Sequence, residues 1–414
     1  MGGAADNGNA ASGGAAQTYG YNGRIRPTRL EIDLDCLAWN TRQIRSITGA
    51  GVKICASMKS NAYGHGAPRA AGTVLSNGAE RLSVAFLDEA LELRSAGVGA
   101  PILILGALEP SGADEIVANG FTQTVSSEED FISLSEAAAR LKSRAFVHIK
   151  ADTGMGRLGF AFDGARSYDG VFAACRLPGI SVEGIFTHFS TADETDAAFT
   201  IRQLDLFNAI CGELSARGLK IPVRHCSNSA AIDGFPQSHM EMVRPGIALY
   251  GGAGRLPGTH HKNPPYKRVM SLRTKVALVK TIPPGASVGY GRRYTAVKTA
   301  RIATLPLGYG DGYNRGLSCG KGEVLIRGRR FPVAGTICMD QCMVDVTGAD
   351  DIRIGDEAVL FGKQGADEIT LEEISVILNT IPYEIMCAIS RRVPRVYVQN
   401  GEPAGHANYL HRNI

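Results

Sequence analysis

This chain lacks the sequence features that mark membrane, secreted and nucleic-acid-binding proteins. No apolar stretch approaches the roughly 20 residues that a helix needs to cross a bilayer, and the N-terminus lacks the basic-then-apolar pattern of a secretory signal. Asp6 stands where a myristoylation site would carry Ser or Thr after Gly2. No dense block of Lys and Arg with interleaved aromatic residues is present, which argues against nucleic acid as a partner. We therefore expect a cytoplasmic protein without membrane association.

The Cys-x-x-Cys spacing of zinc and redox sites is also missing. The nine cysteines, an odd number, contain no Cys-x-x-Cys pair, which disfavours a disulfide framework and a zinc site and favours a reducing compartment. We expect no bound metal. The net charge of +4 is small against 44 basic and 40 acidic residues, and 44% hydrophobic residues are ordinary for a globular protein. The composition therefore excludes a largely disordered chain, and 414 residues leave room for two substantial domains.

The first part of the chain changes from low complexity to a regular alternation of segments. Residues 1–26 are rich in Gly, Ala and Asn, and we expect a disordered leader without a function. A strand-like segment at 30–34 and a helix around Trp39 come next. Further segments have the apolar pattern of buried strands: 52–58, 81–86, 101–106, 122–126, 144–150, 181–187, 223–227 and 242–249.

Helical patterns lie between these strand-like segments. Examples are 87–96 and 201–216, and in the second of these apolar residues recur at three- and four-residue spacing. Strands and helices that alternate in this way predict a parallel β/α architecture, and eight such units match the length of a (β/α)8 TIM barrel over residues 27–263. A doubly wound open sheet is the structural alternative.

The pattern changes again near Asn263-Pro264-Pro265. Residues 264–402 contain alternating runs rich in Val, Ile and Thr that Gly and Pro turns separate, with one helix at 371–379. This is typical of a mainly antiparallel β domain. We expect residues 403–414 to be a tail. The predicted fold class is α/β, with an N-terminal TIM barrel followed by the β domain.

Lys59 is placed where an amine can act as a nucleophile. It follows the apolar run 52–56, and a turn of small residues comes directly after it, so the amine stands at the carboxyl end of a strand. An amine that is shielded from water there can lose its proton and form a Schiff base with a carbonyl cofactor such as pyridoxal phosphate. Tyr63 can reach the phosphate of such a cofactor. The alternative is an exposed lysine before a loop.

Polar residues stand at the ends of several other predicted strands. Arg157 follows the fifth strand, His188 ends the sixth, Ser229 follows the seventh and Arg244 lies on the eighth. Because barrel active sites lie at the carboxyl ends of the strands, we expect these side chains and Lys59 to converge on one mouth.

Phosphate commonly binds after the last two strands of such barrels. Ser229 and the backbone amides of Gly246 and Ile247 lie there. Asn228-Ser229 is also the pattern of a helix N-cap, and the two roles are compatible.

The run from Ser57 to Gly66, SMKSNAYGHG, resembles the cofactor-lysine motif of the alanine racemases, which are fold-type III pyridoxal-phosphate enzymes. Motifs similar to those of this family follow in order between residues 28 and 400: Asp152-Thr153-Gly154-Met155-Gly156-Arg157, Thr187-His188-Phe189, Asn228-Ser229-Ala230, Arg244-Pro245-Gly246, Tyr290, Gly308-Tyr309-Gly310-Asp311-Gly312-Tyr313 and Cys338-Met339-Asp340. The resemblance also implies that the segment 30–34 pairs with the later β domain.

The resemblance implies pyridoxal 5'-phosphate as the cofactor. It assigns these residues to the cofactor site: Lys59, Tyr63, Arg157, His188, Asn228, Ser229, Arg244, Gly246 and Ile247. Arg244 faces the pyridine nitrogen, and because a guanidinium keeps its proton, it donates to that nitrogen and leaves it unprotonated. The ring is then a weaker electron sink, which restrains side reactions. The alternative is that Arg244 pairs with a nearby carboxylate.

Two residues of the β domain complete the site in this family. Tyr290 resembles the second catalytic base, opposite Lys59, and it reaches the active site of the neighbouring subunit. The backbone of Met339 contributes to the substrate-carboxylate site, again from the partner. The resemblance therefore implies a homodimer with shared active sites, in which His188 links Tyr290 to Arg244. Taken alone, a tyrosine between glycines fits a strand residue packed on one face.

Lys150 and Arg391 leave parts of the site open. Arg157 is carried over as the residue that binds the substrate carboxylate, and its planar fork suits that role. Lys150 matches a family lysine that can be carbamylated, and a carbamate would turn a buried cation into an anion that holds Arg157. The alternative is an unmodified lysine directed outward. Arg391 stands where some members carry a tyrosine that contacts phosphate and substrate, so the preference for alanine over serine stays open.

The function that the resemblance implies is the interconversion of L-alanine and D-alanine by two bases, Lys59 and Tyr290, which supplies D-alanine for peptidoglycan. A serine or broad-specificity amino-acid racemase on the same scaffold is the first alternative. A decarboxylase of this fold type is disfavoured because it calls for a carboxylate where Arg244 stands. A non-catalytic pyridoxal-phosphate-binding protein resembles only the barrel, so the β domain argues against it.

Overall fold

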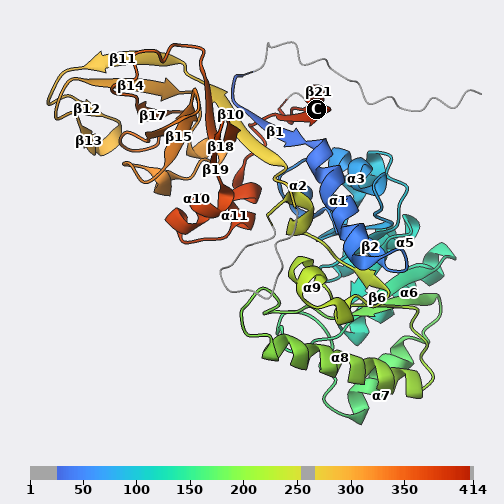
Figure 1. Ribbon diagram of the computed structural model, residues 1–414. Helices are drawn as coiled ribbons and strands as arrows, with labels where there is room; N and C mark the ends of the chain where they lie inside the picture. The colour runs from blue at the N-terminus through green and yellow to red at the C-terminus, as the bar shows by residue number, and fades with distance from the viewer. Residues whose placement is uncertain (1–25, 253–265, 411–414) are drawn as a thin grey trace, which may run out of the picture.

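The computed structural model describes residues 26–252 and 266–410. The predicted leader lies outside the described residues except for Arg26, whose guanidinium pairs with Asp311 at 2.5 Å. The segment near Asn263 and the last four residues of the predicted tail also lie outside them. The chain forms two lobes, a barrel in blue to yellow-green and a β domain in yellow to red (Figure 1).

The barrel is built on an eight-stranded parallel sheet. Its strands are β2 (Lys53–Ser57), β3 (Arg81–Val84), β4 (Ile102–Ile104), β5 (Thr122–Val125), β6 (Ala145–Lys150), β7 (Ile180–Phe186), β8 (Val223–His225) and β9 (Met242–Val243). They pair in the order β8-β7-β6-β5-β4-β3-β2-β9. Between the two end strands, the amide of Arg244 donates to the carbonyl of Ser227 at 2.9 Å. A strand is present at each of the eight predicted places and the TIM barrel is confirmed, whereas the doubly wound alternative is wrong. The eighth strand is shorter than predicted: it ends at Val243, just before Arg244, and Ile247–Tyr250 forms a 3-10 helix.

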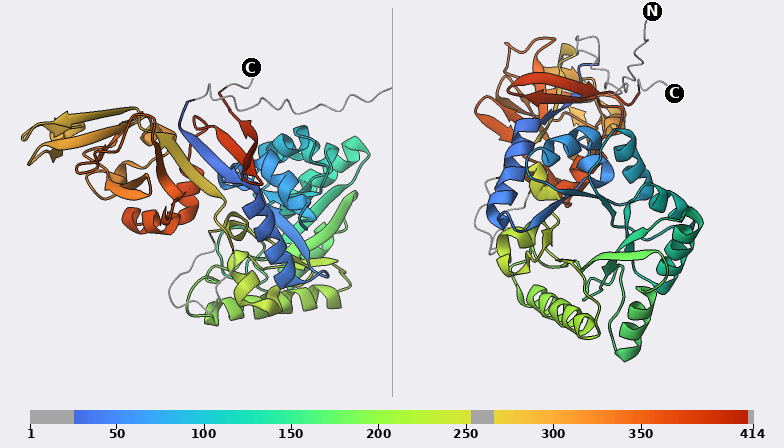
Figure 2. Two further views of the ribbon diagram at one scale, coloured as in Figure 1. Left: turned by 45° about the horizontal axis from the view of Figure 1, so that its top comes forward. Right: turned by 90° about the vertical axis from the view of Figure 1, so that its right-hand side faces the viewer.

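Helices lie around the outside of the strands, as the right-hand view in Figure 2 shows. They are α1 (Leu34–Thr48), α3 (Ala67–Leu75), α4 (Leu87–Ser95), α5 (Ala113–Ala118), α6 (Glu128–Leu141), α7 (Ala165–Ala174), α8 (Ala198–Ala216) and α9 (Ser229–Gly234). The short segment α2 (Lys59–Tyr63) is instead a left-handed turn after β2. In α8 the predicted apolar face is buried, because Leu204, Phe207 and Leu214 pack inward. No helix in the described ranges is long and apolar enough to cross a membrane.

The second lobe is mainly antiparallel, as predicted. Its strands are β10 (Met270–Lys275), β11 (Leu278–Ile282), β12 (Ser287–Val288), β13 (Tyr294–Thr295), β14 (Ala300–Leu305), β15 (Glu323–Ile326), β16 (Arg329–Pro332), β17 (Cys342–Asp345), β18 (Glu357–Gln364), β19 (Asp367–Ile369), β20 (Arg395–Gln399) and β21 (Glu402–Ala407). The first strand of the chain, β1 (Arg29–Asp33), lies between β10 and β20, so its predicted pairing with this lobe is confirmed.

Two predictions for the second lobe need correction. It contains two α-helices within the described residues, α10 (Leu371–Leu378) and α11 (Pro382–Ala388), where the sequence predicted one. α11 begins with Pro382, and proline is compatible with the first turn of a helix although it also occurs in loops. The predicted tail contains β21, which pairs with β20 and extends the sheet.

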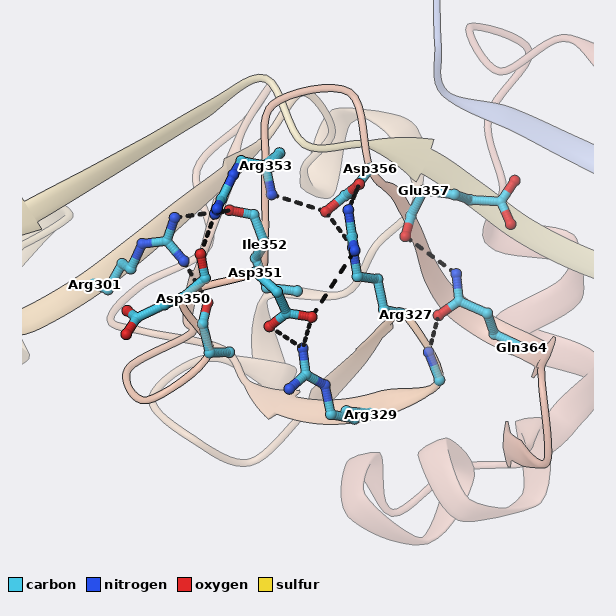
Figure 3. Close-up of polar contacts among 12 residues, drawn as sticks. Arg301, Arg327, Arg329, Asp350, Asp351, Ile352, Arg353, Asp356, Glu357 and Gln364 are labelled. Atoms are coloured by element: carbon cyan, nitrogen blue, oxygen red, sulfur yellow. Dashed lines mark hydrogen bonds and ion pairs between the residues drawn. The ribbon is translucent and has the colours of Figure 1, made fainter.

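An ion-pair cluster fixes the far part of the β domain (Figure 3). Arg327 donates from Nε to Asp356 at 2.8 Å, and Arg329 donates to Asp351 at 2.6 Å. Arg301 on β14 donates to the carbonyl of Ile352 at 2.7 Å. These contacts tie the loop between β17 and β18 to the hairpin of β15 and β16 and to β14, away from the barrel mouth.

Candidate active site

A cavity of about 590 Å³ lies at the carboxyl ends of the barrel strands. The predicted site residues that line it are Lys59, Tyr63, Lys150, Arg157, His188, Asn228, Ser229, Arg244, Gly246 and Ile247. These side chains therefore lie together at one mouth of the barrel, as the sequence predicted. Tyr290 and Met339 do not line this cavity: they lie on the β domain, with 73% and 51% of their surface exposed.

Lys59 begins a left-handed turn. The four residues that follow it have φ angles of 52–54°, and none of the four is glycine. A left-handed conformation costs an L-residue about 1–2 kcal/mol, so the surrounding contacts must hold the turn in place. Glu89 supplies two of them, because its carboxylate accepts from the amide of Ser60 at 2.5 Å and from that of Ala85 at 2.7 Å. The turn thereby fixes the amine at the edge of the cavity.

The β domain braces the same turn from the other side. The side-chain Nδ2 of Asn61 donates to the hydroxyl of Tyr409 at 2.8 Å, and Arg395 donates from Nε to the carbonyl of Gly64 at 2.9 Å. A Cβ at Gly66 would overlap the hydroxyl of Tyr397. Residues that lie far apart in the sequence therefore position Lys59.

The electrostatics of the cavity favour a neutral amine at Lys59. Burial lowers its pKa, and the guanidinium of Arg157 lowers it further. An uncharged amine is the form that attacks a carbonyl carbon. The alternative of an exposed lysine before a loop is wrong, because Lys59 is partly buried and lines the cavity.

Ser229 and the chain after β9 form a cradle for an anion. The hydroxyl of Ser229 accepts from the amides of Gly246 at 2.9 Å and Ala248 at 3.2 Å. A Cβ at Gly246 would lie 2.5 Å from the hydroxyl of Tyr63 and fill the cradle. Burial raises the pKa of Tyr63 to about 12, so its hydroxyl stays a donor. Amides and hydroxyls with no side chain between them fit a phosphate group.

Asn228 is the N-cap of α9. Its side chain accepts from the amide of Ala231 at 3.0 Å. The N-cap interpretation of Asn228-Ser229 is confirmed, and it leaves the hydroxyl of Ser229 in the cradle.

Arg244 is buried beneath the cavity, and each of its described hydrogen bonds goes to a carbonyl oxygen or an imidazole. Nη2 donates to the carbonyl of Thr187 at 2.7 Å and lies 3.3 Å from Nδ1 of His188, and Nη1 lies 2.7 Å from Nδ1 of His225. None of the ion pairs among the described residues includes Arg244, so the predicted alternative of a carboxylate partner is wrong. Burial lowers its pKa to about 10, and the guanidinium remains a donor near neutral pH.

His188 is neutral at neutral pH, because burial and the charge of Arg244 lower its pKa well below the ordinary value. The expected contact between His188 and Arg244 is present. The third member of the expected chain, Tyr290, does not reach His188 within this one chain.

Lys150 and Arg157 flank the other side of the cavity. Lys150 is buried, donates to the carbonyl of Ala151 at 2.9 Å and is therefore not directed outward. Burial, followed by the charge of Arg244, lowers its pKa to about 8. The carboxylate of Asp152 accepts from the amide of Gly156 at 3.1 Å, which shapes the loop that carries Arg157.

Tyr290 and Arg391 do not lie where the sequence suggested. Tyr290 lies in an exposed 3-10 turn that a glycine with positive φ precedes, so it is not a packed strand residue. Arg391 does not line the cavity, and its guanidinium lies 5.5 Å from the centre of the Tyr409 ring.

Comparison with known families identifies the family to which this chain belongs. A family model described as "Alanine racemase, N-terminal domain" matches residues 32–254, and one described as "Alanine racemase, C-terminal domain" matches residues 269–397. The chain belongs to the alanine racemase family.

Relatives and solved structures agree with this assignment. The alanine racemase of Clostridium tetani is 44% identical over 93% of this chain and 99% of its own. A structure of alanine racemase from Clostridium difficile 630 has a TM-score of 0.88 at 38% identity, over 93% of this chain and 99% of that chain. A histidine racemase from Leuconostoc mesenteroides has a TM-score of 0.82 at 28% identity, over 92% of this chain and 100% of that chain.

The sequence did not identify several residues of this racemase site. Phe186, Asp233 and Tyr383 line the cavity as well. Burial raises the pKa of Asp233 to about 6, and its carboxyl accepts from the hydroxyl of Tyr266 at 3.1 Å. An isolated Asp or Phe carries no motif, so only the folded chain reveals them.

Proposed function

We propose that this chain interconverts L-alanine and D-alanine with pyridoxal 5'-phosphate bound in the barrel cavity, and that it supplies D-alanine for peptidoglycan. The observation that carries the proposal is one cavity that holds the Lys59 amine, the Ser229 cradle and the Arg244 guanidinium in a chain of the alanine racemase family. These groups match the carbonyl carbon, the phosphate and the ring nitrogen of the cofactor.

The cofactor, when it is bound, withdraws electrons from the α-carbon of an attached amino acid and so makes its α-proton more acidic. Lys59 would hold the cofactor through its amine and would also hold or deliver the α-proton on one face. Arg157 binds the substrate carboxylate through its planar fork. Arg244 donates to the ring nitrogen and limits the electron withdrawal, which keeps the reaction to proton exchange. Lys150, in carbamylated form, would add a negative charge beside Arg157.

Racemisation also needs a proton donor on the opposite face of the α-carbon. We assign this role to Tyr290 of a partner subunit, and the substrate carboxylate site to Arg157 together with the backbone of Met339 from the same partner. The exposure of Tyr290 and Met339 in a single chain supports a homodimer with shared active sites.

The choice of alanine as substrate rests on relatives, since the fold alone does not decide it. Curated relatives at 42–45% identity are alanine racemases, whereas the histidine racemase with the same fold is 28% identical. Racemisation by the purified enzyme is to be measured by chiral chromatography with alanine, serine and histidine in separate assays. We expect alanine to have the highest kcat/KM. Faster turnover of serine or histidine would move the assignment to another racemase of this family.

Attachment of the cofactor is tested separately. Borohydride reduction followed by peptide mapping should place the label on Lys59, and Lys59→Ala should abolish both label and racemisation. A label on Lys150 would overturn the assignment of Lys59.

A further inference from the structure

A line of buried polar groups runs from Arg244 through the barrel interior, away from the cavity. Nη1 of Arg244 lies 2.7 Å from Nδ1 of His225, and Nε2 of His225 lies 2.7 Å from Nδ1 of His148. Nε2 of His148 lies 2.9 Å from Nη1 of Arg81, and Nη2 of Arg81 donates to the carboxylate of Glu183 at 2.7 Å. Both imidazoles are fully buried, whereas the side chain of Glu183 is 30% exposed. The line therefore joins the cavity to the opposite end of the barrel.

The backbone makes room for this line. The register between β6 and β7 shifts after Val147, so that His148 pairs with Gly184 and Glu183 is an extra residue in β7. Such a bulge re-aims a side chain, and Glu183 accepts from the hydroxyl of Thr122 at 2.9 Å. A Cβ at Gly184 would lie 2.7 Å from Cε1 of His148, so only glycine leaves space for the ring.

The orientation of His225 is fixed as well. Its ring stacks on Phe186 with centroids 4.8 Å apart and an interplanar angle of 9°. Neither imidazole can therefore turn freely to change its partner.

The directions of the hydrogen bonds conflict with one another. A guanidinium only donates, so Nδ1 of His225 must accept from Arg244, and Nε2 of His148 must accept from Arg81. A neutral imidazole carries one N–H, which both rings would then direct into the 2.7 Å gap between them. That gap holds one proton. An additional proton would add another N–H and worsen the conflict, and burial together with the neighbouring guanidinium groups lowers the pKa of both rings well below the ordinary value, so both rings stay neutral.

Glu183 offers the way out: one of its oxygens lies 4.0 Å from Nε2 of His148, beyond hydrogen-bond distance, so a shift of about 1 Å by the carboxylate, with Arg81 moving off Nε2, would bring it into reach. We propose that Glu183, and not Arg81, is the working partner of His148, so that donation runs in one direction from Arg244 through His225 and His148 to Glu183. Both rings then carry the proton on Nε2, and Arg81 pairs with the carboxylate alone. Every bond in this relay has one donor and one acceptor.

The consequence for Arg244 is a fixed guanidinium. Nη1 is held by the relay, and Nη2 is held by the carbonyl of Thr187. His225, His148 and Glu183 are thus positioning residues for the group that faces the cofactor ring. This consequence rests on the proposed function, whereas the directions of the hydrogen bonds do not.

The direct test is the tautomer of each ring. Two-bond ¹H–¹⁵N correlation spectra of the unaltered full chain, with histidine ring nitrogens labelled, are to be recorded with and without pyridoxal phosphate and assigned through His148→Gln and His225→Gln. We expect the Nε2–H tautomer at both rings in both samples. An Nδ1–H tautomer at His148 would overturn the relay, whether or not the protein racemises alanine.

Kinetics supply the second test. Glu183→Leu should lower kcat about tenfold to a hundredfold, as for a misplaced active-site group, and should shift the absorbance maximum of the bound cofactor. Glu183→Gln, which keeps an oxygen acceptor, should recover part of both. Glu241→Leu is the matched control, because it removes the carboxylate of another Arg–Glu pair, with Arg224, and leaves the relay intact.

Unchanged kcat and absorbance in Glu183→Leu, at wild-type stability, would refute the positioning role. If the unaltered protein shows both Nε2–H tautomers but does not racemise alanine, the relay stands and the proposed function fails.

Discussion

Gly246→Ala tests the anion cradle with a single methyl group. The added Cβ would lie 2.5 Å from the hydroxyl of Tyr63, although ordinary contact begins at 3.4 Å, so the hydroxyl or the backbone must move. Tyr63 cannot move easily, since its ring lies 5.0 Å from that of Tyr250 and 6.0 Å from that of Tyr383.

Overpacking of this kind costs about 1–3 kcal/mol of unfolding free energy. The phosphate would occupy the same space, so we expect a loss of cofactor affinity of similar size or larger, which is at least about fivefold in the apparent dissociation constant. Urea denaturation of the cofactor-free protein and absorbance titration with pyridoxal phosphate measure the two effects separately.

Gly72→Ala is the matched control for this change. It introduces the same methyl group into α3, with nothing within 4 Å of the new Cβ, and should stabilise the protein by about 0.5–1 kcal/mol without changing cofactor affinity. An unchanged dissociation constant for Gly246→Ala would refute the placement of the phosphate in the cradle.

The remaining predictions concern the proton donors, the braced turn and a buried carboxyl. Mixing inactive Lys59→Ala and Tyr290→Phe subunits should restore part of the racemase activity, since one site of a hybrid dimer is intact; no recovery despite proven subunit exchange would place the site within one chain. Tyr290→Phe should suppress deuterium exchange at the α-carbon of L-alanine much more than that of D-alanine, and equal suppression would exclude two separate bases. Tyr409→Phe removes the bond to Asn61 and should cost about 1 kcal/mol in urea denaturation and slow the covalent attachment of the cofactor, whereas unchanged attachment would show that the β domain does not position Lys59. Burial raises the pKa of Asp233 to about 6 in the folded state, so the folded state holds the proton more tightly than the unfolded state, and the free energy of unfolding falls as pH rises from about 4 to 6. Asp233→Asn should therefore add up to about 3 kcal/mol to the free energy of unfolding of the cofactor-free protein at pH 7. A variant whose stability depends on pH as strongly as that of the unaltered protein would refute this reasoning.

The barrel could be predicted because its strands are buried. Buried parallel strands read as short apolar runs, and each of the eight matched one. The cavity residues of the barrel were also predictable, since Lys59, Ser229 and Arg244 stand at strand ends or in motifs that the family shares.

Other parts of the site left no signal in the sequence. Nothing in Ser60-Asn61-Ala62-Tyr63 indicates positive φ, because the turn is imposed by contacts with Glu89 and the β domain. The contact between His148 and His225 joins residues 77 positions apart, so only the closed barrel brings them together. Tyr290 does not line the cavity of its own chain, and its proposed place opposite Lys59 requires a second chain.

The bracing of the Lys59 turn has a consequence for how the protein is made. Asn61 and Tyr409 are 348 positions apart, and the contact from Arg395 to Gly64 spans 331 positions. A barrel that leaves the ribosome first therefore lacks the contacts that hold the left-handed turn after Lys59. We expect this turn to reach its final shape only when the last strands of the β domain dock. A chain that stops before Arg395 should therefore leave Lys59 without a fixed position at the edge of the cavity.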